Sequence, residues 1–143
     1  QVADWATVVV PGGDAVFNPQ EKTIAIVNGD NTLLSFLSYT FSGKGHPVKS
    51  FTKGSAALSW FEEVAFHDPP ALVLLDLSLE DVNGIFILES LREVSGSSLP
   101  ILVLSSFEQD EMIIESLQKG ATDYIVRPFN IHYLIEKVAH ALQ

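Results

Sequence analysis

Apolar and polar positions alternate along this chain in blocks that predict a regular succession of strands and helices. Three short, unbroken apolar runs are typical of strands that are buried on both faces of a parallel sheet. A further run begins with a proline, which favours a strand at the edge of the sheet. The predicted strands are residues 24–27, 47–51, 71–75, 100–104 and 123–126.

Between these strands, large apolar residues recur every three or four positions, which predicts amphipathic helices. Asp30 and Ser55 stand where helix N-caps are expected, and Ser106 with Gln109 forms a capping box before the fourth helix. Gly120 supplies the stop of that helix. The predicted inward faces are Leu33, Leu34, Leu37 and Phe41; Leu58, Phe61, Val64 and Ala65; Ile87, Leu88, Leu91 and Val94; and Ile131, Leu134, Ile135, Val138 and Leu142.

Five strands that alternate with five helices predict an α/β domain, with a parallel sheet covered by helices on both faces and joined by right-handed crossovers. The first 22 residues differ in character. Residues 5–10 and 15–17 are short apolar runs around a turn signal at 11–14. They predict a hairpin arm that packs on the domain or on a neighbouring chain, and a linker is the alternative. The expected organisation is an extension at 1–22 and one domain at 23–143.

Composition excludes several functions. The 143 residues carry eight Lys and Arg against eighteen Asp and Glu, which gives a formal net charge of −10. That field repels nucleic acid and anionic membranes, so direct binding to either is not expected. The chain has no cysteine, which excludes disulfides and thiolate metal sites. The four histidines are too scattered for a metal site or catalytic base, and a glycine-rich phosphate loop is missing. A chain that begins at Gln1, with Met112 as its only methionine, is typical of an excised or processed fragment.

The candidate chemistry lies where the strands end. Asp76 follows the apolar run 71–75, and a carboxylate there costs several kcal/mol to desolvate unless it has a partner, a metal or water. The carboxyl ends of the strands in an open α/β sheet are where ligands bind. Asp30, Ser105 and Arg127 also follow predicted strands, so an acid, a hydroxyl and a cation should converge there with Asp76. This composition suits a phosphoryl group or another anion, although each residue alone is more simply a polar loop residue.

Three segments in this order resemble the receiver domain of two-component response regulators. They are residues 76–84, which resemble the phosphoacceptor loop, residues 100–105, which resemble the strand with the switch hydroxyl, and residues 120–129, which resemble the last strand and its loop. The resemblance covers residues 23–143. It implies a flavodoxin-like fold, with five parallel strands in the order 2-1-3-4-5.

The resemblance also implies roles for single residues. An aspartate at the place of Asp76 accepts a phosphoryl group from a histidine kinase, and magnesium is held by acids after the first strand, by the acceptor and by a backbone carbonyl at the place of Ser78. A hydroxyl at the place of Ser105 and a lysine at that of Arg127 bind the phosphoryl oxygens. Tyr124 is the candidate switch aromatic, or else a packed side chain with a solvated hydroxyl.

The departures from the family pattern concern the metal and the cation. Asn28 and Gly29 occupy the positions of the usual acidic pair, and Arg127 replaces the lysine. Asp30, one place later, is a helix cap or a substitute metal ligand beside Asp76. Magnesium prefers hard oxygen ligands, so its binding should be weak. Arg127 either forms an ion pair with Asp76 or points to solvent.

We therefore expect an atypical receiver. It should be a regulatory module and not an enzyme, with a signal other than ordinary magnesium-dependent phosphorylation. One alternative is a working phosphoacceptor that uses Asp76, with Asp30 or water replacing the lost ligand. A second alternative is a small-ligand sensor that uses the same crevice. A ligand pocket beside Ser105 and Tyr124 would favour that second alternative.

The implied partners follow from the same resemblance. A homodimer should form through the fourth helix, the last strand and the fifth helix, a surface that would include Met112, Tyr124 and His132. A histidine kinase and an output domain outside this chain, of a transcriptional kind, complete the expected set. The resemblance implies a cytoplasmic protein.

Overall fold

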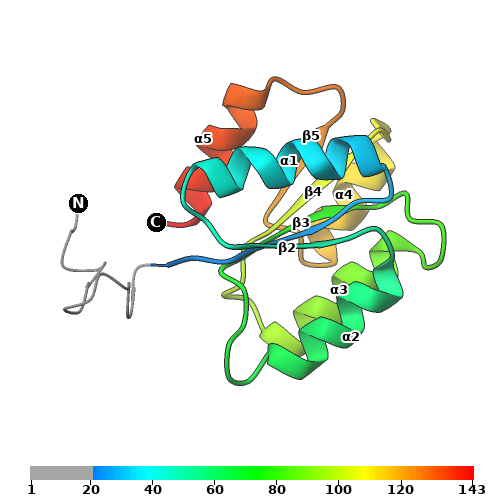
Figure 1. The fold of residues 1–143 in the computed structure, drawn as a ribbon. Coiled ribbons are helices and arrows are strands. Elements are labelled where there is room, and N and C mark those ends of the chain that lie inside the picture. The colour runs from blue at the N-terminus through cyan, green and yellow to red at the C-terminus, as the bar shows by residue number, and fades with distance from the viewer. Residues whose placement is uncertain (1–20) are drawn as a thin grey trace, which may run out of the picture.

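A computed structural model describes residues 21–143 of the chain (Figure 1). The predicted hairpin arm lies outside the described residues. The elements are β1 (Ile24–Val27), α1 (Asn31–Gly43), β2 (Val48–Phe51), α2 (Gly54–Val64), β3 (Leu72–Asp76), α3 (Gly84–Ser95), β4 (Ile101–Ser105), α4 (Asp110–Gln118), β5 (Asp123–Val126) and α5 (Ile131–Ala141). No helix within residues 21–143 is long and apolar enough to cross a membrane.

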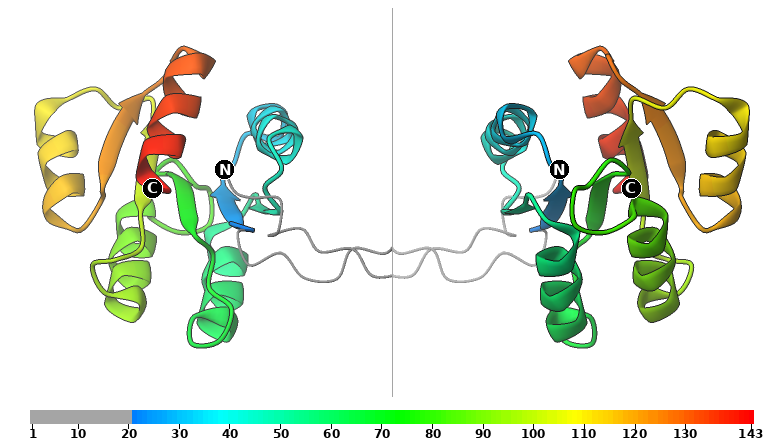
Figure 2. Two further views of the ribbon diagram at one scale, coloured as in Figure 1. Left: turned by 90° about the vertical axis from the view of Figure 1, so that its left-hand side faces the viewer. Right: turned by 90° about the vertical axis from the view of Figure 1, so that its right-hand side faces the viewer.

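The sheet has five parallel strands in the order β2-β1-β3-β4-β5, which confirms the predicted fold. Figures 1 and 2 show α1 and α5 on one face of the sheet and α2 and α3 on the other, with α4 beside β5. β3 lies in the centre of the sheet, between β1 and β4. β2, which carries the predicted edge proline just before it, lies at one edge.

Strand alternation divides the core into two layers. Along β3, Leu72 and Leu74 pack with α1 and α5, whereas Val73 and Leu75 pack with α2 and α3. All four are at most 1% exposed, so β3 is apolar on both of its faces. This double burial explains why an unbroken apolar run, and not an alternating one, encodes the strand.

The helix ends test the capping predictions. Asp30 caps α1, because its carboxylate accepts hydrogen bonds from the backbone N–H groups of Thr32 and Leu33. The prediction that Ser55 caps the next helix is wrong, since α2 begins at Gly54 and Ser55 already belongs to its first turn.

The predicted capping box of Ser106 with Gln109 is also wrong. α4 begins at Asp110, and Gln109 is its N-cap residue without a side-chain hydrogen bond. The segment 106–109 that precedes α4 is irregular, and Ser106 is exposed in it. The acidic residues Asp110 and Glu111 do lie in the first turn, where they favourably face the positive end of the helix.

Arg92, in the last turn of α3, ties two loops at the amino-terminal edge of the sheet. Its guanidinium donates hydrogen bonds to the carbonyl oxygens of Gly96 and Leu99, which precede β4, and to that of Gly120, which precedes β5. The four contacts are 2.6–3.0 Å long. Hydrogen bonds from a charged donor are stronger than neutral ones, so this side chain holds the ends of α3 and α4 together.

Gly84, the first residue of α3, lies against the backbone of the loop that follows β3. A Cβ atom at this position would lie 2.4 Å from Leu77 Cα and 2.7 Å from the Leu77 carbonyl oxygen. Backbone atoms cannot yield as a flexible side chain can. The close approach of α3 to this loop therefore depends on the missing side chain.

We predict that Gly84→Ala lowers the free energy of unfolding by about 3 kcal/mol, because the added methyl group has no space. Gly43→Ala is the matched control, since a Cβ at Gly43 would meet nothing within 4 Å. That control should change the free energy of unfolding by less than about 0.5 kcal/mol. Urea denaturation followed by circular dichroism measures both, and equal stability of the two variants would contradict the prediction.

Candidate functional site

Four side chains gather at the carboxyl-terminal edge of the sheet, where sequence reasoning placed them. Asp76 and Ser105 are the last residues of β3 and β4, and Asn28 and Arg127 directly follow β1 and β5. Asn28, Asp76 and Ser105 are at most 2% exposed. The site is therefore a set of buried polar groups at the end of an apolar sheet, where each group needs a partner.

Asp76 is the only acid among the buried residues of the described chain. Its Oδ1 accepts a hydrogen bond of 3.1 Å from the backbone N–H of Ser78. Burial raises the pKa of Asp76 above its ordinary value, and the hydrogen bond from Ser78 and the charge of Arg127 only partly offset that increase in the pKa. Positive charge or hydrogen-bond donors close to this carboxylate therefore stabilise its ionised form.

Asn28 and Asp30 interact with each other, and Asp30 also interacts with α1. The Oδ1 atom of Asn28 accepts a hydrogen bond of 2.9 Å from the backbone N–H of Asp30. This leaves the Nδ2 atom of Asn28 buried without a hydrogen-bond partner among the described residues. The Asp30 carboxylate caps α1 at 3.0 and 3.2 Å. At residue 28, where the family resemblance implies a carboxylate, this chain has a buried amide donor.

These residues do not suit a magnesium ion. Magnesium is usually held by one or two carboxylates with several waters, and here Asp76 offers one while Asp30 is engaged as a cap. The unpartnered Nδ2 of Asn28 is a donor, which a cation repels. No group of three or more His, Asp or Glu side chains that could hold a metal occurs within residues 21–143. The Ser78 carbonyl lies 3.5 Å from where a Cβ of residue 29 would stand, so an acid at Gly29 would reach this region.

Arg127 lies close to Asp76 but forms no hydrogen bond with it. The distance from Nη2 of Arg127 to Oδ2 of Asp76 is 3.8 Å, which is a long-range ion pair and not a hydrogen bond. The Nε atom of Arg127 is buried and has no partner among the described residues. The structure thus lies between the two arrangements expected from the sequence: the side chain faces Asp76, yet it forms no bidentate pair.

Ser105 and Tyr124 are both bound to the backbone of Phe107. The Oγ atom of Ser105 accepts a hydrogen bond of 3.1 Å from the Phe107 N–H, and the Tyr124 hydroxyl donates one of 2.8 Å to the Phe107 carbonyl. Tyr124 also packs against the core layer of α2 and α3. The aromatic ring is therefore a packed side chain that fixes the segment between β4 and α4.

Asp81 is a polar residue of the site region that sequence reasoning missed. Its carboxylate accepts hydrogen bonds of 2.9 and 3.0 Å from the backbone N–H groups of Gly54 and Ser55, and one of 2.6 Å from the Ser55 hydroxyl. Asp81 thus caps α2 from the loop after β3. These hydrogen bonds lower the pKa of Asp81 to about 2. The contact spans 26 or 27 positions, so no local pattern announces it.

We predict that the stabilisation from Asp81 is lost in acid. A carboxylate whose pKa falls from 3.8 to about 2 on folding stabilises the fold above the higher value, and this contribution disappears as the pH falls toward the lower one. At neutral pH, Asp81→Asn should therefore melt at a lower temperature than the parent chain. That difference should close as the pH falls toward about 2.

Glu80→Gln is the matched control, since it removes the exposed neighbouring carboxylate. Differential scanning calorimetry from neutral to acidic pH measures the melting temperatures of all three chains. A melting difference for Asp81→Asn that is the same at every pH, or that also occurs in Glu80→Gln, would contradict the prediction.

Comparisons with known proteins agree with this geometry. The family model described as the response regulator receiver domain matches residues 24–139. The DNA-binding response regulator MtrA of Mycolicibacterium smegmatis is 33% identical over 122 residues, which cover 85% of this chain and 51% of MtrA. The transcriptional regulatory protein KdpE of Staphylococcus aureus is 35% identical over 82 residues, which cover 53% of this chain and 35% of KdpE.

Solved structures show the same similarity. The BeF3-activated receiver domain of DrrB from Thermotoga maritima matches with a TM-score of 0.76 at 26% identity, covering 85% of this chain and 97% of that one. The BeF3-activated receiver domain of RstA from Klebsiella pneumoniae matches with a TM-score of 0.76 at 25% identity, covering 85% of this chain and 99% of that one. This chain spans about half the length of MtrA, but nearly all of each isolated receiver domain.

Proposed function

This chain belongs to the response regulator receiver domain family, and from that premise we propose that it is an atypical receiver with a signal other than ordinary magnesium-dependent phosphorylation of Asp76. Residues 23–143 form the receiver unit in this proposal, and residues 1–22 form an extension. The unit acts as a regulatory module for an output domain outside this chain.

The observation that carries the proposal is the set of groups around Asp76. Asp76 is a buried carboxylate, and Asn28, at the end of the neighbouring strand β1, carries a buried amide donor without a partner. Asp30, whose charge acts on Asp76, is engaged with helix N–H groups. Magnesium neutralises the charge that develops during phosphoryl transfer. A site without a second available carboxylate holds the ion weakly, so transfer to Asp76 should be slow.

A working phosphoacceptor is the alternative function, and two observations favour it. Asp76 occupies the carboxyl end of the central strand β3, and the hydroxyl of Ser105 lies at the end of the adjacent strand β4. Arg127 supplies a positive charge 3.8 Å from Asp76. In this alternative, water or Asp30 replaces the missing metal ligand.

The proposal includes an output domain and a kinase because of what the relatives are described to be. MtrA is described as a DNA-binding response regulator, and KdpE as a transcriptional regulatory protein. This chain matches only part of each. With its net charge of −10, the present chain is unsuited to bind DNA itself. We therefore assign DNA binding to an output domain, and the phosphodonor role, if Asp76 is used, to a histidine kinase.

We predict that acetyl phosphate with Mg²⁺ labels the parent chain no more than it labels Asp76→Asn. The double variant Asn28→Asp/Gly29→Asp restores two carboxylates, and the space beside the Ser78 carbonyl accommodates the second of them. Its labelling should exceed that of the parent chain by about ten-fold or more, because the metal is then held. Intact-protein mass spectrometry measures the gain of one phosphoryl group.

The variants divide the outcomes. Robust labelling of the parent chain that disappears in Asp76→Asn would refute the proposal and establish the phosphoacceptor alternative. If the double variant also stays unlabelled, adding Arg127→Lys tests whether the guanidinium contributes to the block, since a lysine binds phosphate as a compact point charge.

Dimerisation through α4, β5 and α5 is the second part of the proposal. Ile114 and Leu117 on α4 are 53% and 45% exposed, although they are large apolar residues. Figure 2 shows α4 at the outer side of β5, where a second copy has access. Met112 packs inward against the core layer of α2 and α3, so Ile114 and Leu117, rather than Met112, supply the apolar area. Apolar groups of this kind are typical of an isologous contact.

We predict that Ile114→Asp combined with Leu117→Asp makes the chain monomeric at concentrations where the parent chain dimerises, because each charge would have to be buried in the contact. Phe86→Asp is the control, since Phe86 is 53% exposed on α3, which is not one of the three elements of the proposed contact. Sedimentation velocity measures the mass. A parent chain that stays monomeric near 0.1 mM, roughly the range of weak interfaces, would contradict the prediction.

A further inference from the structure

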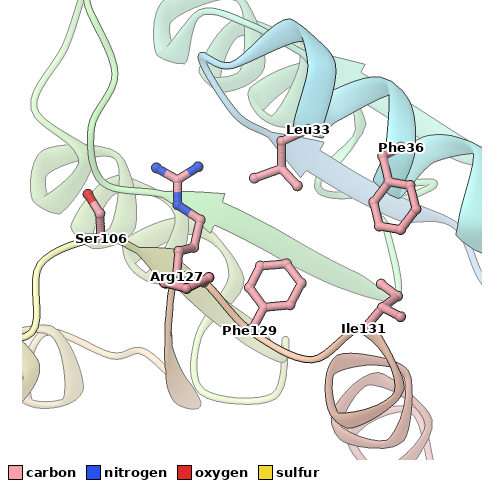
Figure 3. A pocket seen from close by; sticks show the side chains of 7 residues that line it. Leu33, Phe36, Ser106, Arg127, Phe129 and Ile131 are labelled. Carbon is pink, nitrogen blue, oxygen red and sulfur yellow. The ribbon is translucent and has the colours of Figure 1, made fainter.

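An open groove runs beside the candidate site, between α1 and the start of α5. Its volume is about 620 Å³. The walls are mostly apolar, and Figure 3 shows Phe36, Phe129 and Ile131 along its length. The lining residues are Leu33, Phe36, Ser106, Arg127, Pro128, Phe129 and Ile131. The groove therefore lies next to Ser106 and Arg127, and neither Ser105 nor Tyr124, beside which a pocket would favour the sensor alternative, is among its lining residues.

One end of the groove is polar. The guanidinium of Arg127 lies between Ser106 and Leu33 in Figure 3, away from the phenyl ring of Phe129. It is the only charged side chain among the lining residues. Its nearest carboxylate oxygen, on Asp76, is 3.8 Å from Nη2, beyond hydrogen-bond distance. A planar guanidinium can form two parallel hydrogen bonds with a carboxylate, and the pair with Asp76 leaves that capacity unused.

The opposite end of the groove has an exposed aromatic wall. Phe36 is 47% exposed, although it lies next to the partly buried Leu33, one turn earlier on α1. Phe129 and Ile131 pack against the core layer of α1 and α5 with their inner sides. An apolar surface that is backed by the core and open to solvent gains stability when another apolar group covers it.

We propose that this groove binds a small molecule with a carboxylate at one end and an apolar body. The carboxylate lies on the guanidinium of Arg127, with the Ser106 hydroxyl as a neighbouring donor, and the body lies along Phe36, Phe129 and Ile131. Concave sites of about 300–1,000 Å³, largely apolar with a few polar groups at one place, are typical of small-molecule sites. A neutral or cationic molecule would leave the guanidinium without a matching charge.

The local cation decides the sign of the ligand's charge, although the chain as a whole is acidic. Charges further than about 8 Å away are screened at physiological ionic strength, so Arg127 dominates at contact distance. The same side chain faces Asp76. A carboxylate that binds Arg127 therefore competes with Asp76, which connects occupancy of the groove to the buried acid. This inference goes beyond the proposed function, and its test reads binding and not labelling.

Decanoate is the probe. In the parent chain, we expect saturable binding with a dissociation constant in the range of about 0.1–1 mM, which is typical of a weak contact made by few atoms. Decan-1-ol has the same chain without the charge, and decyltrimethylammonium reverses the charge; each should bind at least about ten-fold more weakly. Isothermal titration calorimetry measures the affinities, and ¹H–¹⁵N chemical-shift changes should centre on residues 33–36 and 127–131.

Variants test the two ends of the groove separately. Arg127→Gln should weaken decanoate binding about ten-fold and leave decan-1-ol unaffected. Phe36→Ala should weaken both ligands about three-fold or more. Phe86→Ala is the matched control on the opposite face, where Phe86 is 53% exposed, and should change neither. Decanol binding as tight as decanoate binding, an equal loss in Phe36→Ala and Phe86→Ala, or no saturable binding up to 10 mM, about ten times the weakest affinity expected, would overturn the proposal.

Discussion

A carboxylate at the end of a doubly buried strand is the constraint on which the rest of the structure depends. Leu72, Val73, Leu74 and Leu75 exclude water from both faces of β3, and Asp76 follows them at 2% exposure. The surrounding elements must then supply donors or positive charge from other strand ends. In this chain, the supply is sparse: one backbone N–H from Ser78 and a guanidinium at 3.8 Å. The Nδ2 donor of Asn28, which directly follows the neighbouring strand β1, is buried without a partner and does not supply one to Asp76.

The sheet order and the core faces could be predicted because they rest on a repeated physical signal. Each strand depends on an apolar run and each helix on apolar residues at a spacing of three or four, so single exceptions do not change the result. The predicted strand 123–126 and the predicted cap at Asp30 also agree with the structure. Both predictions depend only on residues that are close in sequence. Solved structures at 24–26% identity share the architecture, because many different apolar residues satisfy one pattern.

The site could be predicted only in part. Its positions follow from the topology, since parallel strands end at one edge, but its contacts depend on side-chain geometry that no spacing encodes. Ser55 looked like a local cap, and the cap is in fact Asp81 from another loop. Ser106 with Gln109 matched a capping box, yet the segment between β4 and α4 is irregular and held by Ser105 and Tyr124 at Phe107. Arg127 faces Asp76 at 3.8 Å, and the sequence alone did not distinguish this long ion pair from a bidentate pair or from exposure to solvent.

The Arg92 contacts lie apart from the candidate site. One guanidinium fastens the loops that lead into β4 and β5, and it does so at the edge of the sheet opposite to Asp76. The edge of the sheet where Arg92 binds these loops contains none of the candidate-site residues. Asn28 and Gly29 lie at the other edge, so substitutions there should not loosen the contacts of Arg92. The stability of the fold and the chemistry of the site therefore depend on different edges of the same sheet, and each can change without the other.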